Sequence, residues 1–232
     1  MGKRIISQAR GHGGPAYQAR KRAFIYKVKY PSNVGEATVM SIFHSAAHSA
    51  PLMKIQVGME IFFIPAFNGA IEGQKITVMG KEVKPGNILA IKDIPPMTQI
   101  YNIEINPGDG GKMVRTAGSS AMVTKMLENN KVSITMTSKK IVIVSGDCRA
   151  TVGVIAGEGK KLKPFIKAGP MFYRMKARNK LWPRTSAVKM NAIDHPFGSG
   201  RGKRIKPKIA KRNAPPGARV GHIRPRRTGR SK

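Results

Sequence analysis

The positive charge of this chain is concentrated at its two ends, and this division limits which parts of it can fold alone. Residues 1–33 hold 8 basic and no acidic residues, and residues 159–232 hold 23 basic residues and one acidic residue, Asp194. Residues 34–158 hold 12 basic and 10 acidic residues, so the middle carries little of the net charge of +32. Because like charges at this density oppose compaction, we expect a folded middle between extensions that need a polyanionic partner.

Nucleic acid is the natural polyanion, because basic side chains on phosphates release condensed counterions. An anionic membrane surface is the generic alternative, but no stretch approaches the roughly 18 apolar residues of a membrane span. Residues 1–10 are basic and lack the apolar run of a secretory signal. The single cysteine, Cys148, cannot form an internal disulfide or a Cys-pair metal site. We therefore expect a cytoplasmic protein without a membrane partner.

Short apolar and β-branched runs, separated by Gly and Pro, predict that the middle of the chain is all-β. The hairpin turn expected at residues 128–131 contains Asn129 and Asn130, which tolerate positive φ. The spacing of the runs suits two consecutive small β-barrels. The expected strands lie at residues 35–43, 54–57, 59–64, 74–78, 87–91, 98–104, 113–115, 121–127, 131–136, 140–144 and 150–155.

The segment 159–232 contains 8 Gly and 8 Pro and few aliphatic residues. Such a composition cannot bury enough apolar surface to offset chain entropy, although a short helix is expected near residues 170–179, where Pro suits the first turn. A disordered solubilising tail is the plain alternative. Aromatic residues such as Phe165 and Trp182 stand among the basic ones, however, and both kinds of side chain stack on bases. We therefore expect this tail to bind RNA and to become ordered on binding.

The motif at residues 190–196, Met-Asn-Ala-Ile-Asp-His-Pro, precedes Phe197 and a glycine-rich loop at 198–200. It resembles the Met-Asn-Pro-Val-Asp-His-Pro motif of the universal large-subunit ribosomal protein family L-two, and Phe197 resembles the archaeal form. Three further segments resemble the family in the same order: 108–118 (Gly-Asp-Gly-Gly-Lys, then Arg-Thr-Ala-Gly), 148–153 (Cys-Arg-Ala-Thr-Val-Gly) and 167–169 (Lys-Ala-Gly). The chain departs from the family at Ala192, Ser199 and His48, which stand where proline, glycine and arginine are usual.

The resemblance implies an OB-like barrel followed by an SH3-like barrel, with long, basic, mostly irregular extensions that penetrate rRNA. The division expected is 1–33 for the N-terminal extension, 34–95 and 96–168 for the barrels, and 169–232 for the C-terminal extension. The implied role is that of a structural constituent of the large ribosomal subunit, in subunit assembly, subunit association and support of the peptidyl transferase region. The implied partners are large-subunit rRNA, other ribosomal proteins and the small subunit across a bridge, with no homo-oligomer.

His195 is the candidate for chemistry, because imidazole can act as a general acid or base near neutral pH. The family histidine at this position has been proposed to support peptide-bond formation, which leaves an enzymatic role as the second hypothesis. The favoured interpretation is a turn histidine that hydrogen-bonds or stacks on RNA, because nothing else in the tail assembles an active site. A third hypothesis is an RNA- or DNA-binding protein outside the ribosome.

Other chemical candidates are weaker. His44 and His48 have the spacing of a helical metal pair, but neither Glu nor Cys completes a site. The loop at 108–112 lacks the spacing of a P-loop, so a turn that offers Lys112 to phosphate is favoured. Cys148 beside Arg149 could have a lowered pKa, but a small core thiol is the better interpretation.

We expect no cofactor beyond magnesium ions associated with rRNA, and no metal site in the protein. Catalytic residues are not expected. The residues expected to contact rRNA are Arg20, Lys21, Arg22, Lys112, Arg115, Arg149, Arg178, Trp182, Arg184, Asn191, His195, Arg201, Lys203, Arg204, Arg226 and Arg227.

Overall fold

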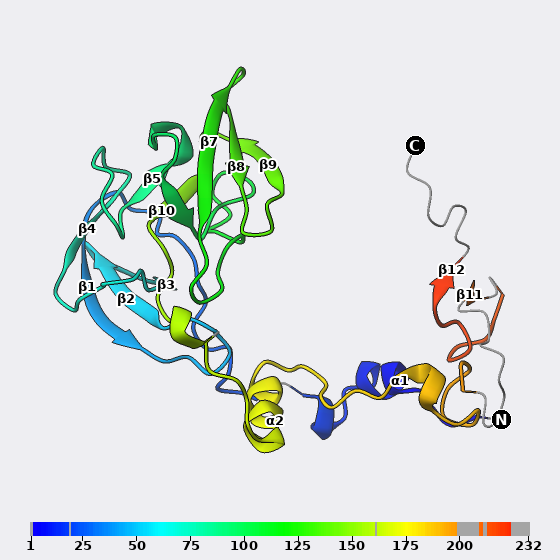
Figure 1. Cartoon of the computed structure of the whole chain (residues 1–232). Coiled ribbons are helices and arrows are strands. Elements are labelled where there is room, and N and C mark those ends of the chain that lie inside the picture. Colours follow the sequence, from blue (N-terminus) through cyan, green and yellow to red (C-terminus); the bar gives the residue numbers. More distant parts are fainter. Residues whose placement is uncertain (1, 19, 161, 199–208, 211–212, 224–232) are drawn as a thin grey trace. The chain divides into compact units, whose positions relative to one another are not determined.

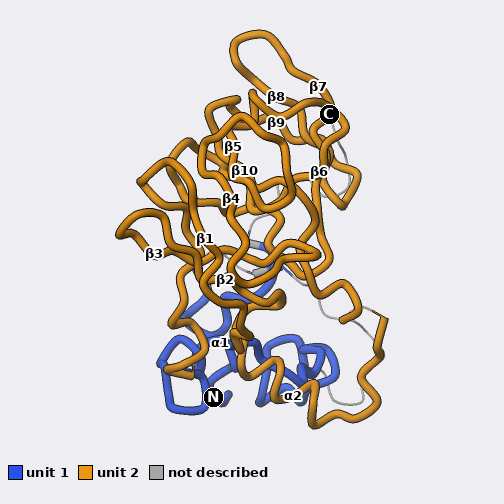
Figure 2. The backbone as a smooth tube through the Cα atoms, turned by 90° about the vertical axis from the view of Figure 1, so that its left-hand side faces the viewer, with its two compact units in different colours: residues 1–19, 179–232 blue, residues 20–178 orange. Residues whose placement is uncertain are grey.

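The structure is a computed structural model that describes residues 2–18, 20–160, 162–198, 209–210 and 213–223. The chain divides into two compact units, which Figure 2 colours separately. Unit 2 is the continuous segment Arg20–Arg178, and it holds the large β-sheet. Unit 1 combines Met1–Ala19 with Asn179–Lys232. The domain boundaries expected at residues 33, 95 and 168 stay predictions.

Ten strands of unit 2 form one sheet, in the order β3-β2-β1-β4-β5-β10-β6-β7-β8-β9 (Figure 1). Pairing is antiparallel except between β4 and β5. The all-β prediction is confirmed, and the arrangement is consistent with two successive barrel-like halves. The strands are β1 Gly35–Phe43, β2 Leu52–Val57, β3 Glu60–Pro65, β4 Lys75–Val78, β5 Ile88–Ala90, β6 Gln99–Tyr101, β7 Ala121–Leu127, β8 Lys131–Thr135, β9 Ile141–Ser145 and β10 Arg149–Val152.

Two hydrophobic cores explain why the runs read from the sequence form strands. The first core gathers side chains of β1 to β4, and the second gathers side chains of β6 to β10. The two cores interleave along the chain. Leu89 and Ile91 belong to the second core, whereas Tyr101 and Ile155 belong to the first. Strand β10 pairs with both β5 and β6, so it joins the two halves of the sheet.

The segment that precedes β1 packs onto the sheet. Tyr30 is buried, its hydroxyl donates to the carbonyl of Asn102 at 2.7 Å, and it lies 2.8 Å from Oγ1 of Thr151. Tyr26 contacts the rings of Phe43 and Phe63, with centroids 4.5 and 5.0 Å away. The last part of the expected N-terminal extension is therefore held by the folded region.

Two local predictions are confirmed, and one is wrong. Asn129 and Asn130 both adopt positive φ in the three-residue turn between β7 and β8, a conformation that asparagine tolerates. Helix α2, Ala168–Ala177, lies where a short helix was expected, with Pro170 in its first turn. Residues 113–115 form no strand: Met113 makes an isolated bridge with Ile103, and the positive φ of Val114 turns the chain away.

The described part of unit 1 contains little regular structure. Helix α1 spans Ile6–Gly11, and 3-10 turns span Pro15–Tyr17 and Ala187–Lys189. Strands β11, Ile209–Ala210, and β12, His222–Ile223, form a short parallel pair. In unit 2, 3-10 turns span Ile91–Asp93 and Glu158–Lys160. No helix of the described residues is long and apolar enough to cross a membrane.

Candidate nucleic-acid interface

The motif around His195 folds as a compact turn of unit 1. The carbonyl of Asn191 accepts the backbone amides of Asp194 and His195, at 3.0 and 3.2 Å. The amide of Gly198 then donates to the carbonyl of His195 at 2.8 Å. A Cβ atom at position 198 would overlap the backbone of Asn191. The glycine after Phe197 is therefore required by close packing inside the turn.

The imidazole of His195 is oriented by the turn itself. The amide of Phe197 donates to Nδ1 of His195 at 3.0 Å, so the neutral ring keeps its proton on Nε2. The ring also packs against Phe197, with centroids 5.0 Å apart. Asp194 instead forms an ion pair with Lys3 at 3.5 Å. This geometry leaves Nε2–H as a hydrogen-bond donor and directs the neighbouring carboxylate to another partner.

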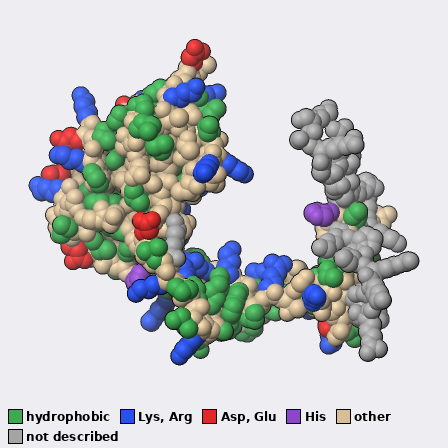
Figure 3. Space-filling model, viewed as in Figure 1, with side chains coloured by type: hydrophobic (Ala, Val, Ile, Leu, Met, Phe, Trp, Pro, Cys, Tyr) green, Lys and Arg blue, Asp and Glu red, His purple; other side chains and the backbone are tan. Residues whose placement is uncertain are grey.

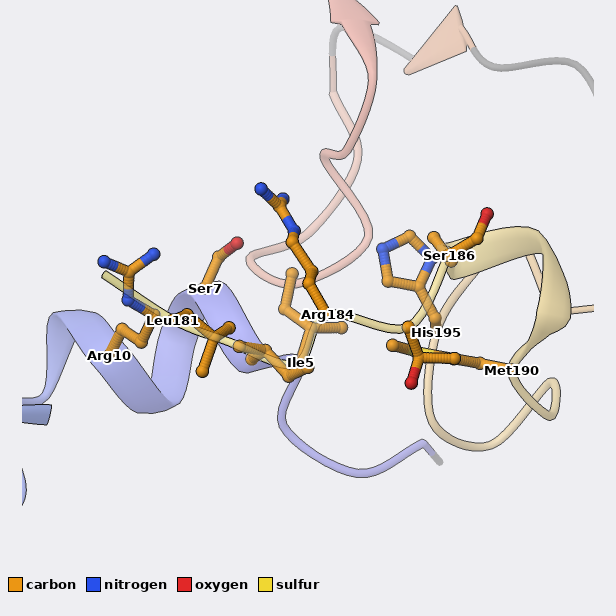
Figure 4. Close-up of a pocket in the computed structure, with 11 residues that line it drawn as sticks. Ile5, Ser7, Arg10, Leu181, Arg184, Ser186, Met190 and His195 are labelled. Atoms are coloured by element: carbon orange, nitrogen blue, oxygen red, sulfur yellow. The ribbon is translucent and has the colours of Figure 1, made fainter. Parts of the chain in front are cut away.

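A cavity of about 350 Å³ lies beside this turn. Figure 4 shows the guanidinium of Arg184 and the imidazole of His195 on the same side of the chain as the hydroxyl of Ser7. Ile5 and other apolar side chains complete the lining, which also includes Leu181 and Met190. A guanidinium group beside apolar side chains can bind a phosphate together with the adjoining base of a nucleic acid.

Arg149 has a different environment from a free surface cation. Its Nη2 lies 2.9 Å from Oε1 of Glu104, a carboxylate whose side chain is fully buried. Nη1 donates to the carbonyl of Pro31 at 2.8 Å, and the guanidinium lies over the ring of Tyr30 at 5.2 Å. The predicted rRNA contact of Arg149 therefore has to coexist with an internal ion pair to Glu104 and with a hydrogen bond that ties β10 to the segment before β1.

The glycine-rich loop at 108–112 is organised by two carboxylates of the chain. The amide of Gly110 donates to Glu104 at 3.0 Å, and the amide of Gly111 donates to Oδ1 of Asp109 at 3.1 Å. Burial raises the pKa of Asp109, but donated backbone hydrogen bonds outweigh it and lower that pKa overall. Since protein carboxylates take these amides, the amides are not available to a phosphate, and the exposed Lys112 itself lies 3.5 Å from the carboxylate of Asp109.

Arg115 is half-buried beneath this loop. Its Nη1 donates to the carbonyl of Gly111 at 3.1 Å, and burial lowers its pKa. Its positive charge also contributes to the lowered pKa of His48, although burial of that imidazole is the larger cause. Nδ1 of His48 lies 2.8 Å from the hydroxyl of Ser45. No group of three or more His, Cys, Asp or Glu side chains in the described residues could hold a metal ion.

Cys148 is a core thiol, as favoured from the sequence. It is fully buried, and its Sγ lies 3.6 Å from the carbonyl of Ile105. Burial raises the pKa of the thiol to about 11, with a further contribution from Glu104. The alternative of a lowered pKa is therefore wrong, because low-dielectric surroundings and nearby carboxylates both disfavour a thiolate.

The remaining predicted contacts fall into three groups. At the start of unit 2, Arg20, Lys21 and Arg22 are exposed. At the end of unit 2, Arg178 is partly buried. Trp182, Arg184 and Asn191 lie in unit 1 near the His195 turn. Arg201, Lys203, Arg204, Arg226 and Arg227, like Ser199, lie outside the described residues. Contact of each residue with rRNA stays a prediction.

Several basic residues that line cavities were missed by the sequence reasoning. Arg10 lines the cavity beside His195. Lys160 and Arg174 line a second cavity, in unit 2, together with Arg178. The spacing of Arg174 and Arg178, four residues apart on an expected helix, was the available signal, because such residues share a helix face.

Comparison with known sequences identifies relatives along the whole chain. The family described as "Ribosomal Proteins L2, C-terminal domain" matches residues 84–217. The chain is 41% identical to a Korarchaeum cryptofilum protein over 240 residues, which cover 100% of this chain and 97% of the relative. It is 42% identical to a Hyperthermus butylicus protein over 239 residues and 100% of both chains. An Archaeoglobus fulgidus protein is 42% identical over 236 residues, 99% of each chain. All three are named "Large ribosomal subunit protein uL2", and their archaeal origin agrees with the form indicated by Phe197.

Proposed function

The chain belongs to the ribosomal protein L2 family, and from this membership we propose that it is a structural constituent of the large ribosomal subunit that binds large-subunit rRNA. The proposed role is not enzymatic. It supports subunit assembly, subunit association and the peptidyl transferase region in translation. The proposed location is the cytoplasm, within the large subunit, with other ribosomal proteins and the small subunit as neighbours.

The observation that carries this proposal is the separation of charge from folded core. The nearly neutral middle of the chain contains the large sheet and nearly all of both cores, whereas the outer parts of the two basic ends, 1–19 and 179–232, form unit 1, whose described residues contain little regular structure. A polyanion should bind the ends of such a protein favourably, because counterion release accompanies each phosphate contact. Phosphate contacts would position the protein, and contacts to unstacked bases would add local specificity.

The surroundings of His195 favour recognition over chemistry. Its Nδ1 accepts a hydrogen bond from the backbone, and the adjacent Asp194 pairs with Lys3. A general base needs a free acceptor nitrogen within reach of the proton that it removes. The remaining Nε2–H suits donation to an RNA oxygen. Magnesium ions bound by the rRNA are the only metals that this role calls for.

A salt titration tests the rRNA-binding part of the proposal. The affinity of the full chain for large-subunit rRNA should fall steeply and linearly with salt on logarithmic axes. An affinity that hardly changes with salt would contradict electrostatic binding. Co-sedimentation with large subunits through a salt-containing gradient separates a ribosomal constituent from a free RNA- or DNA-binding protein.

Reconstituted large subunits test the non-enzymatic part. Particles that carry His195→Ala should form peptide bonds at the normal rate once they are correctly assembled. A large loss of rate in fully assembled particles would instead establish a chemical role for the imidazole.

A further inference from the structure

A pocket in unit 2 gathers basic side chains whose close approach does not contribute to the folding of the chain. This pocket, of about 390 Å³, lies between α2 and the loops that follow β1 and the 3-10 turn Glu158–Lys160. Its side chains include Lys160, Lys163, Arg174 and Arg178, with His48 and Phe165 beside them. In Figure 3, Lys and Arg side chains gather around α2, whereas on the sheet they alternate with acidic ones.

The pocket is built by contacts that fix its cations. The guanidinium of Arg174 lies over the ring of Phe165, 4.8 Å from its centroid. Nζ of Lys160 donates to the carbonyl of Ser49 at 3.1 Å, which ties the loop before β2 to the turn before α2. Stacking and hydrogen bonding therefore hold both side chains in place without neutralising their charge.

Two guanidinium donors in this pocket are buried without a partner. Nε of Arg174 and Nη2 of Arg178 have no hydrogen-bond acceptor among the described residues. A buried donor that belongs to a charged group is costly when it is unpaired. Most buried polar groups are satisfied in folded proteins, so these two donors indicate an acceptor that the folded chain does not supply.

The electrostatics of the pocket lead to the same conclusion. Burial lowers the pKa of Lys160, and the charges of Arg174 and Arg178 lower it further. Burial, followed by the charge of Arg174, also lowers the pKa of Arg178. No Asp or Glu lines the pocket among the residues that the structure describes. Lys160, Arg174 and Arg178 therefore repel one another, and no described residue of the pocket supplies a counter-charge.

We propose that this basic pocket binds a phosphodiester group of the RNA backbone, with Arg174, Arg178 and Lys160 as its donors. The proposal deepens the proposed function and rests on it. A phosphate has several acceptor oxygens, which match the planar forks of two arginines and the point charge of a lysine. The pocket, of about 390 Å³, has room for a phosphate group.

Binding of the full chain to large-subunit rRNA, measured over a range of salt concentrations, tests the proposal. The double variant Arg174→Gln with Arg178→Gln should bind at least tenfold more weakly than wild type. Its salt slope should be smaller by roughly 1 to 2, since about two phosphate contacts are lost. The matched control, Lys81→Gln with Lys125→Gln, removes two exposed charges outside the pocket and should change affinity much less.

A second double variant covers the case in which the first does not fold. Arg174→Lys with Arg178→Lys keeps both charges but loses the planar forks. It should bind rRNA several-fold more weakly than wild type and retain most of the salt slope. Pocket variants that bind no more weakly than the control would overturn the pocket assignment, although wild-type binding would still support the proposed function. Wild-type protein that does not bind rRNA at all would overturn both.

Inorganic phosphate separates the two sources of the same chemistry. The melting temperature of the full chain is measured in sodium phosphate and in sodium chloride of equal ionic strength. If phosphate stabilises wild type more than the Arg174→Gln/Arg178→Gln variant, and rRNA affinity also falls in that variant, the pocket recognises phosphate on RNA. Stabilisation by phosphate with unchanged rRNA affinity would assign the pocket to a free ion and overturn the proposal.

Discussion

The guanidinium of Arg149 and the fully buried carboxylate of Glu104 form an ion pair between β10 and the segment that follows β6. Nη2 of Arg149 lies 2.9 Å from Oε1 of Glu104, and the backbone amide of Arg149 donates to Oε2 at 2.8 Å. Glu104 also accepts the amide of Gly110. One carboxylate therefore holds β10 and the glycine-rich loop together.

Glu104→Gln should destabilise the protein strongly, because it leaves the guanidinium of Arg149 buried without a counter-charge. The expected loss in the free energy of unfolding is about 3–5 kcal/mol, measured by urea denaturation. Glu36→Gln is the control, because it breaks an exposed pair with Lys75 and should cost at most about 1 kcal/mol. Equal effects of the two substitutions would contradict a structural role for the buried pair.

Gly111→Ala should be much more destabilising than Gly108→Ala. Both glycines have positive φ, of 87° and 83°, so alanine costs about 1–2 kcal/mol in either place. A Cβ at 111 would also lie 2.5 Å from the carbonyl oxygen of Asn102, whereas nothing lies within 4 Å of one at 108. Urea denaturation of the two variants isolates the clash, and similar losses would show that the loop can move aside.

The thiol of Cys148 should react only when the protein unfolds. Its pKa is raised from 9.0 to about 11 by burial. The unfolded thiol ionises first as pH rises, so its contribution to stability is complete below about pH 9 and is lost as pH passes through about 11. Labelling by a thiol reagent near neutral pH should be slow in buffer and fast in urea. Rapid labelling of the folded chain would mean that the thiol is accessible.

Arg184→Gln should weaken rRNA binding and leave the stability of unit 2 unchanged. The side chain is exposed beside the His195 cavity in unit 1, so its loss removes a phosphate contact and lowers the salt slope by roughly 1. The variant Arg184→Lys should preserve the slope while losing part of the affinity, because it keeps the charge without the fork. A variant Arg184→Gln with wild-type affinity at every salt concentration would remove Arg184 from the interface.

The strands could be predicted because each short apolar and β-branched segment of the middle of the chain has to bury its own apolar side chains. Strand β1 begins and ends as expected, and the two asparagines of the β7–β8 turn fulfil their conformational preference. The prediction of a strand at 113–115 is wrong, because the positive φ of Val114 depends on its packing against both cores rather than on local propensity. Apolar composition there could not distinguish a strand from a tightly packed loop.

The sequence by itself determined the all-β middle, the basic ends and the family, since these follow from composition, periodicity and motifs of adjacent residues. The tertiary structure decided which cations are free to meet a partner. In the sequence, Arg149 cannot be distinguished from other basic residues, but in the fold its charge is neutralised by Glu104, which lies 45 residues away along the chain. Arg174, Arg178 and Lys160 line one pocket in which no carboxylate of the described residues pairs with them. The availability of a charge depends on what the fold places within a few ångströms of it, and local sequence does not contain that distance.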